Sequence, residues 1–261
     1  ERERLGTVEA DFVRPEAFWV DVASWLTGDP LHHVVTLNPE MVMQAQTNPI
    51  FRDAVAAADA RVPDGAGIIW ARWYLRSTYW SLWPSLLAFM FQSAERVTGV
   101  DVVQALARCC SEAGHSMYLL GGTAVQVAGT TAALQRNFPN LQLFTSRTHA
   151  FSLDGPADIL KDITAKHPKV LLVAYGSPQQ TIWIERHRKK LHGVTVAVGV
   201  GGAFAILAEE RPRAPHVLRK LNLEWLWRLT LEPRRLPRIW QAAVRFPILI
   251  HAQKKGVQRS V

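Results

Sequence analysis

The feature that most constrains the fold of this chain is a series of short apolar runs, each followed by turn-forming residues and then a helical pattern. The runs show little polar alternation, which indicates strands that are covered on both faces. Strands that alternate with helices in this way form βαβ units with parallel strands. We therefore predict an α/β chain with a Rossmann-like, mostly parallel sheet and helices on both faces. The predicted strands are 31–36, 61–63, 117–120, 141–144, 170–175 and 194–200.

Two of the predicted strands lead into polar residues that would meet at one edge of the sheet. Thr36 and Asn38 come at the end of the first apolar run, and Asp64 follows the run at 61–63. Ligands of open α/β sheets bind just beyond the carboxyl ends of the strands, so these three side chains are expected to lie together. The proline before Asp64 and the glycine after it favour a turn that holds the carboxylate clear of the sheet. Asp64 is therefore our first candidate for a catalytic residue, and the alternative is that it caps the next helix.

Glycines follow three of the other predicted strands. The turn Gly121-Gly122-Thr123 stands between a strand and a helix, an arrangement that can present backbone N–H groups to a phosphate. It is neither a GxGxxG nor a Walker sequence, so in isolation it is more typical of a plain tight turn. The glycines that we consider for nucleotide binding are Gly121, Gly122, Gly176, Gly201 and Gly202.

The sequence lacks the motifs that usually hold a metal ion. It has no Asp-x-Asp pair, which commonly binds a metal on a nucleotide diphosphate, and no HExxH or paired CxxC motif. Its two cysteines, Cys109 and Cys110, are adjacent, a spacing that suits neither a disulfide nor zinc and is typical of a reducing compartment. We therefore expect no metal and no cofactor, with phosphates held by backbone amides and by Arg or Lys.

The basic charge of the chain is concentrated near its C-terminal end. Residues 211–261 contain 12 Lys and Arg against two acidic residues, a net charge of +10, whereas residues 1–210 carry a net charge of −2. A basic segment of this kind suits a nucleic acid, an anionic lipid or a phosphorylated ligand. We expect an α/β catalytic domain over 1–210 and a basic helical appendage over 211–261, which contacts a membrane or the active site.

An aromatic-rich insertion is expected at 68–94, within the first domain. Four of the ten tryptophans of the chain lie there, and the run 80–91 is almost wholly apolar but too short to span a bilayer. Because Trp and Tyr favour the headgroup level of a membrane, the insertion could lie at a membrane surface together with the appendage. A buried pair of helices explains the same pattern equally well.

Eight short motifs occur in an order that resembles the WecG/TagA/CpsF family of bacterial glycosyltransferases. The resemblance covers about residues 30–240, and the ordered set is more specific than any single motif. The aromatic insertion further resembles the branch of this family that transfers glucose in xanthan-type exopolysaccharide assembly. The motifs are Thr36-Leu37-Asn38, Val62-Pro63-Asp64-Gly65, Glu95-Arg96-Val97-Thr98-Gly99-Val100-Asp101, Leu119-Leu120-Gly121-Gly122, Gly176-Ser177-Pro178-Gln179-Gln180, Gly199-Val200-Gly201-Gly202-Ala203-Phe204, Arg213-Ala214-Pro215 and Leu223-Glu224-Trp225-Leu226-Trp227-Arg228-Leu229.

The resemblance implies an inverting, metal-independent enzyme that uses a UDP-sugar. It would transfer a hexose, with glucose as the expected sugar, to a sugar on undecaprenyl diphosphate. The enzyme would be peripheral at the cytoplasmic face of the inner membrane, with an anionic membrane surface as partner and no nucleic acid, and it could form a homo-oligomer. Within the family, the alternative donors are UDP-N-acetylmannosamine and N-acetylmannosaminuronic acid. The alternative of another class is a non-catalytic module that docks on membranes.

The resemblance also assigns roles to particular residues. Asp64 is expected to be the general base, because a sugar hydroxyl is a poor nucleophile until a carboxylate accepts its proton. Arginines or helix N-termini would stabilise the leaving UDP. Substrate-binding roles fall on Thr36, Asn38, Arg96 and Gln180. The acceptor diphosphate and the membrane would be contacted by Arg213, Arg219, Arg228, Trp225 and Trp227.

Three places depart from the pattern of many relatives, and one of them is Glu209-Glu210, where those relatives have a small glycine-rich segment. Thr181 stands where many of them have Glu, and Ala205 stands where many have Asp. These changes argue against assuming an N-acetylmannosamine donor.

Overall fold

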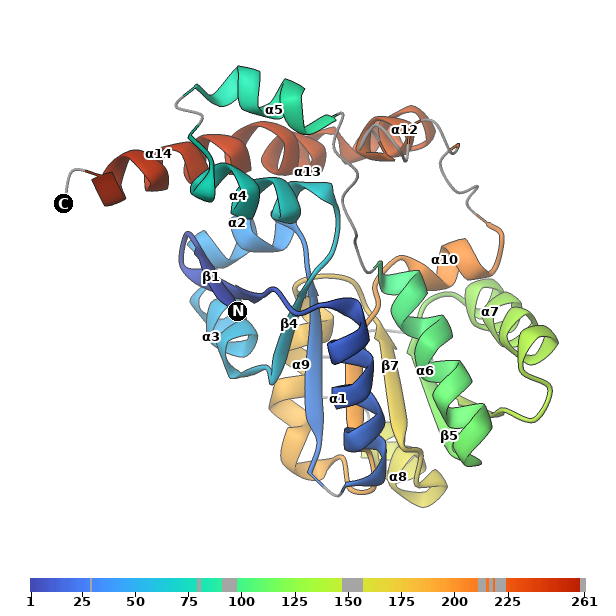
Figure 1. The fold of residues 1–261 in the computed structure, drawn as a ribbon. Coiled ribbons are helices and arrows are strands. Elements are labelled where there is room, and N and C mark those ends of the chain that lie inside the picture. The colour runs from blue at the N-terminus through green and yellow to red at the C-terminus, as the bar shows by residue number, and fades with distance from the viewer. Residues whose placement is uncertain are drawn as a thin grey trace.

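A six-stranded parallel sheet, with the strand order β4-β3-β8-β7-β5-β6, forms the centre of the molecule (Figure 1). The structure is a computed structural model that describes residues 1–28, 30–78, 81–90, 98–146, 157–210, 215, 218 and 224–258. Each predicted strand is present, so the predicted fold class is confirmed. The strands are β3 (His32–Leu37), β4 (Ala60–Pro63), β5 (Ser116–Gly121), β6 (Gln142–Thr145), β7 (Val170–Ala174) and β8 (Val196–Gly199).

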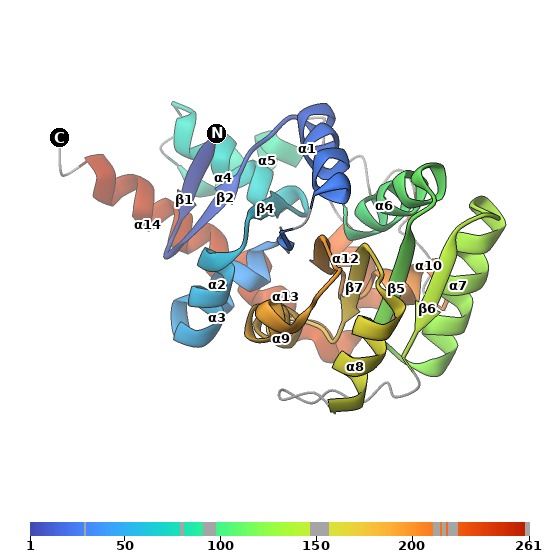
Figure 2. The same cartoon turned by 90° about the horizontal axis from the view of Figure 1, so that it is seen from below.

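Helices cover both faces of this sheet (Figure 2). Successive side chains of a strand point to opposite faces, so Leu119 and Leu172 pack in one core and Leu120 and Leu171 in the other. This arrangement explains why the strands read as continuous apolar runs. One face is covered by α1 (Pro15–Thr27), α6 (Gly99–Ala113), α7 (Ala124–Asn137) and α10 (Ala203–Leu207), and the other by α3 (Pro49–Ala57), α8 (Ala157–Lys166) and α9 (Gln179–His187).

Side-chain caps mark where four of the helices begin. Asn38 caps α2 (Pro39–Thr47) and Asn48 caps α3, each accepting a hydrogen bond of 3.0 Å from the backbone N–H three residues later. Thr98 caps α6 and Thr123 caps α7, each in a capping box with the side chain three residues later. Asn38 and Thr123 lie in loops that follow a strand, so these two caps help to set the direction in which the chain leaves the sheet.

A separate apolar core lies beside the carboxyl ends of β3 and β4. It joins α2 and the N-terminal hairpin of β1 (Arg2–Leu5) and β2 (Val8–Asp11) to α4 (Ala66–Arg76), α5 (Leu82–Met90) and α14 (Phe246–Gln258). Trp70 and Tyr74 of the aromatic insertion are buried in it, which agrees with the buried alternative for that part of the segment.

The last helix of the chain belongs to this core, which corrects one expectation. We expected the basic appendage to be separate from the folded core, but Phe246 and Ile250 are fully buried and pack with Trp70. The Lys254 ammonium donates to the carbonyl oxygens of Tyr74 and Ser77, at 2.5 and 2.7 Å, and so satisfies the end of α4. The charge of the tail could not predict that its last helix enters the core, because Lys254 is buried although it belongs to a basic segment. The division of the chain at residue 210 stays a prediction.

The rest of the described tail consists of short helices on the same side of the molecule. They are α12 (Glu224–Leu231), a 3₁₀ turn (Pro233–Arg235), α13 (Leu236–Trp240) and a π-helical turn (Gln241–Arg245) that leads into α14. The tail packs on α2, where Arg238 lies 3.6 Å from Glu40. In the described part of the chain, no helix is both long enough and apolar enough to cross a membrane.

Candidate active site

The chain leaves the adjacent strands β3 and β8 in opposite directions. After β3 it passes through α2 and α3 toward β4, whereas after β8 it enters α10, which packs on α6 and α7 (Figure 1). A point where neighbouring connections diverge is where open α/β sheets bind ligands, because the diverging loops leave a crevice at the strand ends. The predicted site residues Thr36, Asn38 and Asp64 lie at this rim.

Asp64 lies next to the end of β3. In the parallel pairing of β3 with β4, Leu37 is opposite Pro63, and the Asp64 N–H donates to the Leu37 carbonyl at 2.8 Å. The side chain of Asp64 is partly exposed. The N-cap of α4 is Gly65, which has a φ of 90° and makes no side-chain cap. The N-cap position of this helix is thus held by Gly65 and not by Asp64.

Thr36 and Asn38 hold the local structure of the rim. Thr36 is 6% exposed, and its hydroxyl donates to the carbonyl of Gly199 at 3.2 Å, which links the ends of β3 and β8. The side-chain oxygen of Asn38 accepts from the Met41 N–H and caps α2. Direct contact of either residue with a substrate stays a prediction.

Gln180 ties together two loops of the rim. Its side chain is 4% exposed, and its Oε1 accepts from the N–H of Gly176 at 3.1 Å and from the N–H of Gly201 at 3.0 Å. A Cβ atom at position 199 would lie 2.6 Å from Gln180 Nε2, so the glycine there makes room for this amide. Gln180 thus positions the loops after β7 and β8, and its predicted contact with substrate stays a prediction.

The glycine turns are used differently from what the sequence suggested. We expected their N–H groups to face a phosphate, but those of Gly176 and Gly201 donate to Gln180, and that of Gly122 donates to the Ala174 carbonyl at 3.1 Å. Gly121 ends β5 and Gly202 directly precedes α10. The structure therefore assigns Gly122, Gly176 and Gly201 to the framework of the rim. Nucleotide binding near them stays a prediction.

Replacing Gln180 with Ala is expected to lower the free energy of unfolding by about 1 to 3 kcal/mol, because two backbone N–H groups lose their acceptor. Turnover should fall as well, since both loops border the crevice. Urea unfolding and steady-state assays would measure these effects, with the partly exposed neighbour in Gln179→Ala as the control. An unchanged unfolding midpoint for Gln180→Ala would contradict the bridging role.

A polar chain from the rim to the tail was missed in the sequence. Ser177 donates to Gln44 Oε1 at 2.7 Å, and Gln44 Nε2 donates to Glu40 Oε1 at 3.0 Å. The same Glu40 oxygen lies 3.6 Å from Arg238 Nε. The spacing of Glu40 and Gln44 places them on one face of a helix. Nothing in the sequence pointed to partners more than 130 residues away.

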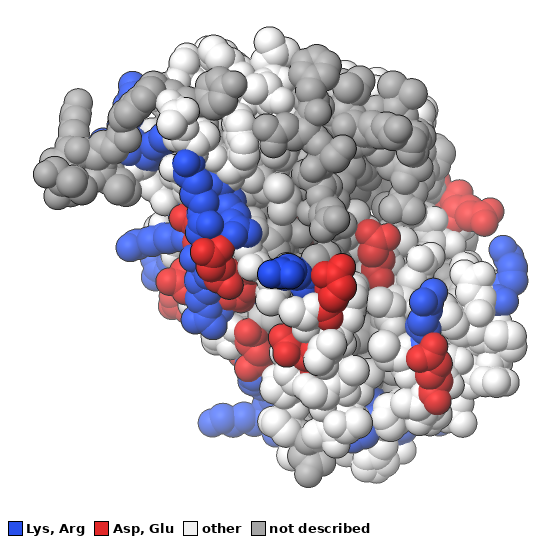
Figure 3. Space-filling model, in the orientation of Figure 1, with Lys and Arg blue, Asp and Glu red and all other residues white. Residues whose placement is uncertain are grey.

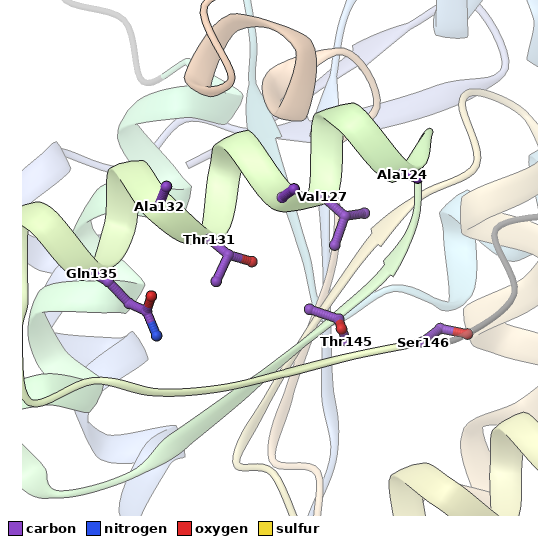
Figure 4. A pocket seen from close by; sticks show the side chains of 8 residues that line it. Ala124, Val127, Thr131, Ala132, Gln135, Thr145 and Ser146 are labelled. Carbon is purple, nitrogen blue, oxygen red and sulfur yellow. The ribbon is translucent and has the colours of Figure 1, made fainter.

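A shallow cavity of about 440 Å³ lies at the other edge of the sheet. It runs between α7 and the end of β6, and it is lined by side chains such as Thr131, Gln135 and Thr145 (Figure 4). Five strand spacings separate β4 from β6 in the sheet, which amounts to about 24 Å. This cavity is therefore not next to Asp64, and we assign no catalytic role to it.

Several predicted site residues cannot be placed. Arg96, Arg213 and Arg219 lie outside the described residues. Trp225 and Arg228 belong to α12, but their side chains are outside the described part, whereas Trp227 of the same helix is partly buried. Among the described residues, no group of three His, Cys, Asp or Glu side chains could hold a metal ion. Both cysteines are free thiols.

The chain is similar to known proteins along most of its length. A family model described as "Glycosyl transferase WecG/TagA/CpsF family" matches residues 4–260. A protein of Staphylococcus aureus strain NCTC 8325 / PS 47 is 27% identical over 222 residues, which are 85% of this chain and 81% of that protein. Its name is N-acetylglucosaminyldiphosphoundecaprenol N-acetyl-beta-D-mannosaminyltransferase. The protein of the same name in strain MRSA252 is 26% identical over the same share of each chain.

Proposed function

Because the chain belongs to the WecG/TagA/CpsF family of glycosyltransferases, we propose that it transfers N-acetylmannosamine from UDP to lipid-linked N-acetylglucosamine. The acceptor would be N-acetylglucosamine on undecaprenyl diphosphate, as the name of the relatives states. The observation that carries this proposal is the match along most of both chains, 85% of this one and 81% of the relative. The family model covers residues 4–260, which include Asp64 and all six strands of the sheet.

This proposal replaces the sugar that the sequence suggested. We expected glucose and a close likeness to the xanthan-type branch, but the relatives compared above are mannosaminyltransferases. The departures at Thr181 and Ala205 were the argument against N-acetylmannosamine as the donor sugar. Thr181 and Ala205 are 1% and 2% exposed, so they pack inside the protein. Their burial weakens the argument against N-acetylmannosamine.

In the proposed reaction, a hydroxyl oxygen of the acceptor sugar attacks the anomeric carbon of the donor. The bond from that carbon to the phosphate oxygen breaks, and UDP leaves with its electron pair, which inverts the anomeric centre. Asp64 accepts the hydroxyl proton as the new bond forms. Its partly exposed carboxylate at the end of β4 suits this role. Basic side chains of the tail would stabilise the charge on UDP without a metal ion.

A donor panel tests the proposal. Purified protein would be mixed with a short-chain N-acetylglucosaminyl diphosphate lipid and UDP-N-acetylmannosamine, UDP-N-acetylmannosaminuronic acid or UDP-glucose, and products would be identified by mass. We expect the N-acetylmannosamine product, formed at an unchanged rate in EDTA. A glucose product would overturn the assignment of the donor, and loss of the reaction in EDTA would overturn metal independence. No product from any donor, together with no binding of UDP, would favour the membrane-docking module instead.

A further inference from the structure

The first turns of α2 and α4 touch each other beside Asp64. Both helices begin at the rim, α2 at Pro39 after β3 and α4 at Ala66 after β4 (Figure 1). A Cβ atom on Gly67 would lie 2.5 Å from Cγ of Pro39. Carbon atoms in contact normally lie about 3.5 to 4.0 Å apart, so a residue without a side chain is needed for the two helices to approach this closely.

The backbone of Gly67 gives no other reason for a glycine. The residue lies in the first turn of α4 and does not have a positive φ, in contrast to Gly65. Glycine is a poorer helix former than alanine, so a glycine at a helical position needs an explanation. The contact with Pro39 supplies one.

This contact closes a ring of residues that contains Asp64. The ring is formed by two short segments, residues 37–39 and 64–67. It is closed on one side by the hydrogen bond of 2.8 Å from the Asp64 N–H to the Leu37 carbonyl. On the other side it is closed by Gly67 against Pro39. The position of Asp64 at the rim therefore depends on both closures.

Neither helix can move away to make room for a side chain at position 67. Ile68 and Trp70 of α4 are buried in the same apolar core as Met41 and Val42 of α2. Helix α4 also forms ion pairs with the N-terminal hairpin, and the basic and acidic side chains of this region lie together in Figure 3. Both helices are thus held from several sides.

The part of the ring that can give way is the part next to Asp64. The proline ring fixes φ at position 39, and Asn38 is held by its cap on the Met41 N–H at 3.0 Å. Gly65 is different, because a Cβ atom there would have nothing within 4 Å and its φ is 90°. A side chain at position 67 would therefore displace the backbone at residues 64 and 65.

We propose that Gly67 is a positioning residue for Asp64, and that its close contact with Pro39 holds the carboxylate where it can accept the proton of the acceptor hydroxyl. This assignment rests on the proposed function, in which Asp64 is the general base. A base must lie within hydrogen-bond reach of the proton that it accepts. A displacement of about 1 Å can lower a rate about 10²-fold.

The test begins with Gly67→Ala, assayed with the short-chain acceptor and the donor that gives a product in the panel. We expect kcat to fall about 10- to 100-fold, whereas KM for the donor stays within about twofold, because the base acts in the transition state and does not hold the donor. Pro39→Ala/Gly67→Ala should recover most of the lost kcat. In this double variant the clashing Cγ is absent, and the Cβ atoms at positions 39 and 67 would lie 3.6 Å apart.

A second pair of variants separates positioning from a general loss of stability. In the Asp64→Asn background, Gly67→Ala should change kcat by less than about twofold, because no base is left to position. Gly114→Ala is the matched control, since Gly114 has a φ of 69° with nothing within 4 Å and lies before β5, at the other end of the sheet. It should lower the unfolding temperature by about 2 to 4 °C and leave kcat unchanged.

Four kinetic results would each overturn the proposal: a kcat within twofold of the wild type in Gly67→Ala, an equal loss in the Asp64→Asn background, an equal loss in Gly114→Ala, or no recovery with Pro39→Ala. Crystal structures give a readout without turnover. The Asp64 carboxylate of Gly67→Ala should be displaced from Asn38 by at least about 0.5 Å relative to the wild type, and superimposable carboxylates would overturn the proposal. If no donor gives a product with the wild type, the proposed function fails, and this crystallographic comparison decides on the positioning role by itself.

Discussion

Replacing Asp64 with Asn is expected to lower kcat by about 10² to 10⁴ and to leave the fold intact. The amide has the shape of the carboxylate but cannot accept a proton from the acceptor hydroxyl. The backbone should not change, because Asp64 is tied to Leu37 through its own N–H, and because α4 begins at Gly65 without a side-chain cap. Steady-state kinetics with the short-chain acceptor would measure the loss, and thermal unfolding would verify the fold.

Asp59→Asn is the matched control, because Asp59 lies just before β4, at the end of the strand opposite Asp64. Its carboxylate accepts from the His33 N–H at 2.7 Å and pairs with Arg188 at 2.5 Å. This variant should be less stable than the wild type but should keep its kcat. If Asp64→Asn keeps more than about half of the wild-type kcat, Asp64 is not the general base.

Replacing Phe246 with Ala should lower the free energy of unfolding by about 3 to 5 kcal/mol. The ring is fully buried and packs edge-to-face with Trp70, their centroids 6.5 Å apart. Its loss would leave a cavity between α14 and α4, which the surrounding helices can fill only in part. Urea unfolding followed by far-UV circular dichroism would measure the change in free energy.

Ile248→Ala on the same helix is the control, because Ile248 is 51% exposed. Its free energy of unfolding should stay within about 0.5 kcal/mol of the wild type. A change of less than about 1 kcal/mol in Phe246→Ala would mean that the tail is an independent appendage, as its charge first suggested.

The sequence predicted the elements of the sheet because their signals are local. Each apolar run is short and ends in turn residues, and the caps at Asn38 and Thr98 depend on residues within one helical turn. The common rim of Thr36, Asn38 and Asp64 also followed, because parallel strands end at the same edge of a sheet. The N-terminal hairpin was not predicted, because ion pairs with a distant helix, such as Arg76 with Glu3, hold it in place.

The sequence by itself determined the fold class, the family and the candidate base Asp64, all of which depend on short motifs and on their order. Only the tertiary structure decided what Gln180 and Phe246 do, because their partners lie far away in the chain. Gln180 holds the loops of two different strands, and Phe246 fills a core next to Trp70. Burial, too, depends on which segments the fold brings together. A basic and aromatic tail therefore gave no sign in its composition of which side chains enter the core and which remain exposed.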